Sequence, residues 1–96
     1  MVDRTYEKLL VMRIIGHIDH PVLKITVMQL GDKYVLKIEH TLMEQTYKIR
    51  EADEMRGYND VSKLVDEQFL KECIERFQQM NTSLFESFKR NLNWNP

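Results

Sequence analysis

Hydrophobic and polar residues follow two different periods along the chain. Residues 9–50 are rich in Val, Ile, Leu, Thr and Tyr at alternating positions, which is the period of β-strands. Residues 60–92 repeat instead at the period of an α-helix. The charged segment 51–60, which contains Gly57 and Asn59, predicts the connecting loop. The pattern therefore predicts strands first and a helix second.

A tight turn at Gly31 and Asp32 predicts a hairpin with a defined register. Gly31 can supply the positive φ that a type II′ turn requires. Both faces of the resulting ladder are chemically consistent, whereas a slip of one residue would set apolar side chains against charged ones. The predicted pairs are Val27 with Leu36, Ile25 with Ile38, Leu23 with His40, Thr26 with Lys37 and Lys24 with Glu39.

An earlier strand is predicted by placing a turn at Asp19 and His20, with Pro21 as the first residue of the next strand. This register extends the apolar face by pairing Ile14 with Ile25, Met12 with Val27 and Leu10 with Gln29. The run 6–15 is apolar nearly throughout, so it also fits a short buried helix. Strand and helix both stay open for this run, and the strand is preferred.

After Thr41 the alternation changes phase, because Tyr47 and Ile49 are odd-numbered whereas Leu36 and Ile38 are even-numbered. The change predicts a bulge or corner near residues 42–44. Either the third strand is long and kinked, or a short fourth strand begins there.

The helical segment carries one continuous apolar arc from Phe69 to Leu92, with Asp66 as the expected N-cap. Residues 60–65 lie off this arc and predict a separate turn or a bent first segment. The sequence thus predicts one α+β domain over residues 1–96. Its expected form is an antiparallel meander of three to four strands (about 9–18, 22–30, 33–41 and 45–50), with one face covered by a long amphipathic helix (about 66–92).

Composition narrows the class of protein without identifying a partner. The 96 residues are 43% hydrophobic and 30% charged with a net charge of -1, which fits one small folded domain and excludes a multi-domain enzyme. This balance gives no general attraction to nucleic acid or anionic lipid. The single cysteine, and the lack of a signal peptide or an apolar run of membrane-spanning length, lead us to expect a cytoplasmic protein.

Metal binding and catalysis find little support. His17, Asp19 and His20 resemble a set of zinc ligands, but the predicted register places His17 and His40 on opposite faces of the sheet. Cys73 lies in the apolar arc, where a thiol is usually a small buried hydrophobic group. No nucleophile motif or phosphate loop is present. We therefore expect no metal, cofactor or catalytic residue, and enzymatic activity is left open as the less favoured class.

Two alternative binding sites follow from the predicted sheet. Arg13, Lys24 and Lys37 form a basic face that suggests RNA binding, but no aromatic side chain accompanies them for base stacking, so nucleic acid is disfavoured. In the alternative interpretation as a ligand-binding or enzymatic domain, Tyr34, His40 and Tyr47 line a pocket between sheet and helix. Core packing is the simpler explanation for these three residues.

Self-association is the preferred functional prediction. A helix over 66–92 would be about 40 Å long, whereas a strand of nine residues spans roughly 30 Å, so the helix should extend beyond its own sheet. The side chains expected at the overhanging end, and hence at a dimer interface, are Leu84, Phe85, Phe88 and Leu92. We therefore predict a homodimeric interaction or structural module without catalysis. A different protein partner also fits this pattern.

Overall fold

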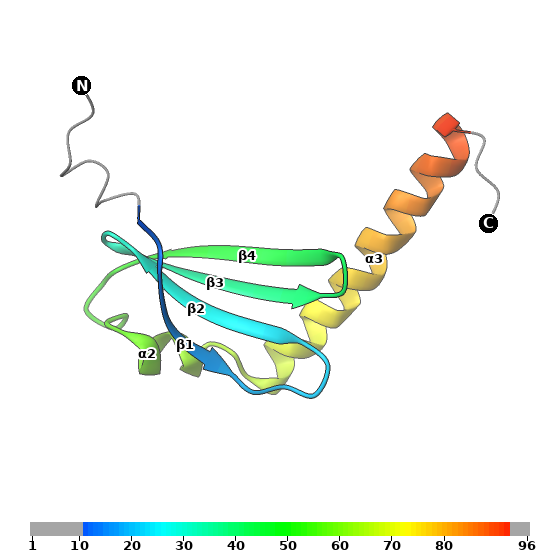
Figure 1. Cartoon of the computed structure of the whole chain (residues 1–96). Helices are drawn as coiled ribbons and strands as arrows, with labels where there is room; N and C mark the ends of the chain where they lie inside the picture. The colour runs from blue at the N-terminus through cyan, green and yellow to red at the C-terminus, as the bar shows by residue number, and fades with distance from the viewer. Residues whose placement is uncertain (1–10, 93–96) are drawn as a thin grey trace, which may run out of the picture. The chain divides into compact units, whose positions relative to one another are not determined.

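Residues 11–92 are described by the computed structural model, and within them four strands are followed by two helices. The strands are β1 (Arg13–Ile18), β2 (Lys24–Leu30), β3 (Lys33–His40) and β4 (Met43–Arg50), and the helices are α2 (Tyr58–Lys63) and α3 (Glu67–Leu92). The strands form one antiparallel sheet in the order β1-β2-β3-β4 (Figure 1). The predicted α+β fold, a meander followed by a long C-terminal helix, is confirmed.

The hairpin between β2 and β3 has the predicted register. Gly31 adopts a φ of 61°, the positive value that the turn requires. Lys24 lies opposite Glu39, and Ile25 lies opposite Ile38. We call the face of Lys24 and Glu39 the outer face, and the face of Ile25 and Ile38 the inner face.

The hairpin between β3 and β4 turns at Thr41 and Leu42, where Thr41 has a φ of 50°. Its register runs without interruption from His40 opposite Met43 to Lys33 opposite Arg50. A turn of two residues always sets even positions opposite odd ones, so it accounts for the change of phase without a bulge. The alternative of a fourth strand is therefore correct, and that strand is longer than predicted.

The predicted register of β1 is wrong. Ile18, rather than Ile14, lies opposite Ile25. A loop of five residues, 19–23, replaces the expected turn of two, and His20 Nδ1 accepts hydrogen bonds from the backbone N–H groups of Val22 (3.1 Å) and Leu23 (3.0 Å). The sequence leaves the run 6–15 open between strand and helix, and its residues 13–15 belong to the strand β1. Residues 6–10 of that run lie outside the described residues.

Strand β1 also contains a bulge between Ile14 and Gly16, where the register shifts by one residue. Gly16 then lies opposite Val27 on the inner face, and the ring of Tyr58 from α2 occupies the space that a side chain at Gly16 would fill. The Tyr58 hydroxyl donates a 2.7 Å hydrogen bond to the carbonyl oxygen of His17. The first turn of α2 is thus fixed to β1.

The buried apolar residues of the sheet lie mainly on the inner face. Successive side chains of β2 and β3 point to opposite faces of the sheet, and the buried ones are mostly those of the inner face. Val61 of α2 is also fully buried. The inner-face set is Leu23, Ile25, Val27, Tyr34, Leu36 and Ile38. The predicted core residues Ile14 and Met12 are instead 61% and 44% exposed, because the register of β1 differs from the predicted one.

Helix α3 begins where the sequence predicted. The Asp66 carboxylate accepts a 2.8 Å hydrogen bond from the backbone N–H of Phe69, which is the contact of an N-cap. Residues 58–63 form the separate helix α2, as expected for the segment before the cap. The chain divides into two compact units at Val65 and Asp66. The expected cover of one sheet face by the helix, and the single domain, stay predictions.

Substitution of Gly16 by Ala should destabilise the sheet unit by roughly 1–3 kcal/mol, because a methyl group there overlaps the Tyr58 ring. Urea denaturation measures this difference. The control is the same substitution in a Tyr58→Ala background, where the space is open and the additional loss should be close to zero. An equal loss in both backgrounds would show that the Tyr58 ring is not the cause.

Candidate functional site

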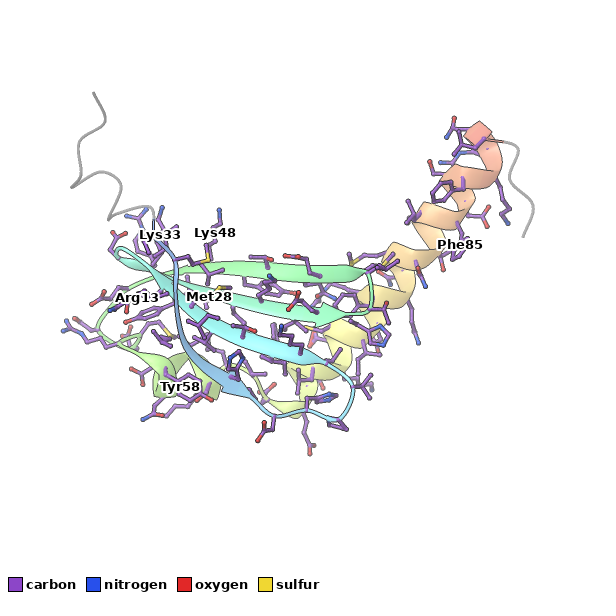
Figure 2. The ribbon with its side chains drawn as sticks, viewed as in Figure 1. Arg13, Met28, Lys33, Lys48, Tyr58 and Phe85 are labelled. Carbon is purple, nitrogen blue, oxygen red and sulfur yellow. The ribbon has the colours of Figure 1, made fainter. Side chains whose placement is uncertain are left out.

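The most prominent exposed apolar surface belongs to the second half of α3. Cys73 and Phe77 in its first half are buried, whereas the apolar residues further along are exposed to between 36% and 65%. We call these exposed residues the α3 stripe, and Figure 2 shows Phe85 projecting from the helix. The stripe consists of Met80, Leu84, Phe85, Phe88 and Leu92. All four residues predicted for the dimer interface belong to it.

Small polar residues border the α3 stripe and leave shallow recesses beside its large side chains. One recess is lined by Met80, Ser83, Leu84 and Ser87, and a second lies beside Phe88 and Leu92. On the opposite arc, Lys89 and Glu86 form a 2.9 Å ion pair. The helix therefore presents apolar ridges next to hollows, which is the surface form that packs against another helix.

The predicted basic face is only partly assembled. Lys24 and Lys37 lie on the outer face, and Lys37 Nζ is 3.6 Å from Glu39 Oε1. Arg13 does not join them, because it lies opposite Gln29, an inner-face position, and its guanidinium is 3.5 Å from Gln29 Oε1. The described outer-face positions of β2, β3 and β4 include no aromatic residue. RNA binding stays an untested alternative with one of its three cations elsewhere.

The outer face instead contains two like-charge pairs that the sequence analysis did not identify. Lys33 lies directly opposite Arg50 at one end of the β3–β4 ladder, and Glu39 lies opposite Glu44 near the other end. Figure 2 shows Lys33 and Lys48 close to the same end of the sheet. Like charges at directly opposed positions destabilise a ladder. The charges of β4 are thus mismatched with those of β3.

Tyr34, His40 and Tyr47 share the inner face. Tyr34 is 4% exposed and lies opposite Ile49, and Tyr47 lies opposite Leu36. The Tyr47 hydroxyl donates a 2.8 Å hydrogen bond to Gln45 Oε1. These contacts match the expected packing role of a tyrosine with a bonded polar tip. A ligand pocket formed by these three residues stays a prediction.

The histidines are separated as the sequence analysis argued, although by a different register. His17 lies opposite Thr26 on the outer face, with its Nδ1 3.5 Å from Thr26 Oγ1, whereas His40 lies opposite Met43 on the inner face. Within residues 11–92, no group of three or more His, Cys, Asp or Glu side chains is arranged to hold a metal ion. Cys73 is buried and forms no disulfide, and Arg76 Nη2 lies 3.5 Å from its Sγ.

Neither helix in the described part of the chain is long and apolar enough to cross a membrane. No protein-family model, curated protein or solved structure matches this sequence.

The like-charge pair at Lys33 makes a testable prediction about stability. Lys33→Glu should stabilise the sheet by about 0.2–1 kcal/mol, because it creates an opposite-charge pair with Arg50. The matched control is Lys24→Glu, which should destabilise by a similar amount because it creates a like-charge pair with Glu39. Thermal denaturation at low salt measures both, and shifts of the same sign would contradict the assigned pairs.

Proposed function

We propose that this protein is a self-associating interaction module without catalytic activity, in which α3 packs against α3 of a second copy. The observation that carries the proposal is the exposed α3 stripe, which extends over the last thirteen residues of the helix (80–92). Exposed apolar residues at helical spacing on one arc mark a surface that binds another helix. A cytoplasmic location belongs to the same proposal, since a cysteine that forms no disulfide fits a reducing compartment.

The area of the stripe supports a specific pair of helices. About 80 Å² of apolar surface from each of its five residues amounts to about 400 Å² per copy and about 800 Å² in a pair. Apolar atoms make up roughly 57% of a typical interface, so the complete contact would cover about 1,400 Å². This value lies within the range of about 1,200–2,000 Å² for stable complexes.

The shape of the stripe favours a second α3 as its occupant. Ser83 and Ser87 leave hollows beside Leu84, and Leu84 and Phe88 supply side chains large enough to enter such hollows on a second helix. The same surface thus offers both ridges and grooves, which a twofold contact requires because each copy uses the same residues.

Light scattering on the full chain at micromolar concentration should give a mass of at least twice 11.6 kDa. Phe88→Glu should lower that mass by a factor of two or more, because it places a carboxylate in the apolar contact. Thr82→Glu introduces the same charge at an exposed helix position that lines neither recess, and it should leave the mass unchanged. A mass of 11.6 kDa for the unmodified chain would refute the proposal.

A further inference from the structure

The two edges of the sheet differ in how well they are protected. Along β1 the bulge between Ile14 and Gly16 interrupts the edge, and the His17 carbonyl oxygen already accepts a hydrogen bond from the Tyr58 hydroxyl. Strand β4 is the opposite edge, and its eight residues pair with β3 without a bulge or a proline. A long regular edge of this kind is a surface to which another strand can add.

The turn at Thr41 and Leu42 determines which backbone groups of β4 point away from the sheet. In a hairpin with a turn of two residues, the pair that flanks the turn, here His40 and Met43, exchanges hydrogen bonds. Bonded pairs then recur at every second position, so the odd residues of β4 bond to β3. The even residues Glu44, Thr46, Lys48 and Arg50 direct their N–H and C=O groups outward.

The side chains of these even residues lie on the outer face, where β3 opposes them with like charges. Glu44 faces Glu39, and Arg50 faces Lys33. Glu39 is paired with Lys37, and Glu44 accepts a 2.9 Å hydrogen bond from the Thr46 hydroxyl, but among residues 11–92 no ion pair is formed by Glu44, Lys48 or Arg50. The acid and the bases of β4 are placed at its two ends, so an antiparallel copy of the same strand would complement both of them.

We propose that β4 pairs antiparallel with β4 of a second copy, about a twofold axis through Tyr47. The axis must keep even residues opposite even residues, because these carry the outward backbone groups. Centring on Tyr47 sets Glu44 opposite Arg50 of the partner subunit and Thr46 opposite Lys48 of the partner subunit. Symmetry repeats each contact, so two opposite-charge pairs form and the two sheets join into one.

One neighbouring register is the main competitor. An axis through Thr46 sets Glu44 opposite Lys48 of the partner subunit, but it moves Arg50 opposite Leu42 of the partner subunit and leaves that cation without an acid. An axis through Lys48 sets two lysines opposite each other. The Tyr47 axis is preferred because it alone matches both charged ends of the strand.

This β4 contact is independent of the α3 contact, because the two use different residues. When the two contacts join different copies, a chain that forms both assembles as dimers of dimers or as longer arrays. We therefore test β4 in the Phe88→Glu background, in which the α3 contact is removed. That variant should have about twice 11.6 kDa by light scattering.

Charge reversals at the two ends of β4 provide the test. Adding Glu44→Lys or Arg50→Glu alone sets like charges across the β4 contact and should weaken dimerisation at least tenfold, giving a mass of 11.6 kDa. Mixing the two single-reversal proteins in equal amounts should restore the dimer, because Lys at position 44 then faces Glu at position 50 and Glu44 faces Arg50. The chain that carries both reversals should also dimerise. Lys24→Glu, on an interior strand, is the control that leaves the mass unchanged.

Unfolding does not account for the expected loss of mass, because each reversal removes a like-charge pair with β3. Circular dichroism should therefore show that each single variant keeps the folded far-UV spectrum and the cooperative unfolding transition of Phe88→Glu, at a melting temperature lowered only by the loss of the dimer. A monomeric Phe88→Glu protein, single reversals that remain dimeric, or a mixture that remains monomeric would each overturn the β4 contact. If Phe88→Glu has the same mass as the unmodified dimer, the α3 contact fails and the β4 contact does not.

Discussion

The turns at Gly31–Asp32 and Thr41–Leu42 determine which residues of β2, β3 and β4 share a face. Each contains two residues, so each sets odd positions of one strand opposite even positions of the next. Val27, Leu36 and Tyr47 consequently fall on the inner face. The same geometry fixes which backbone groups of β4 face outward, so both the core and the free edge of the sheet follow from the turns.

The small helix α2 links the core of the sheet to its protected edge. Tyr58 reaches the inner face because Gly16 has no side chain, and its hydroxyl binds the His17 carbonyl oxygen. One turn further on, Val61 is fully buried. Because the bulge in β1 brings Gly16 opposite Val27, the irregularity that interrupts this edge also creates the space in which the Tyr58 ring lies.

The hairpin of β2 and β3 could be predicted because a glycine turn and the chemistry of both faces agreed on one register. Strand β1 could not, since its loop is closed by the side chain of His20 and its register shifts at a bulge. Gly16 within an apolar run was the available signal of a close contact. Periodicity alone identified the α3 stripe, whereas the mismatched charges of β4 became visible only once Thr41 and Leu42 were known to form the turn.

The arrangement of charges on β4 also determines which partners this edge rejects. A parallel, in-register copy would set Glu44 against Glu44 and Arg50 against Arg50, which repel, whereas the antiparallel copy sets acid against base. Once two β4 strands are paired, the edges that remain within the described residues are the two β1 strands, which the bulge and Tyr58 protect. Strand addition through the proposed contact therefore stops at two sheets. Within one chain, Glu39 and Lys33 oppose Glu44 and Arg50 with like charges, whereas the proposed second copy opposes both with unlike charges.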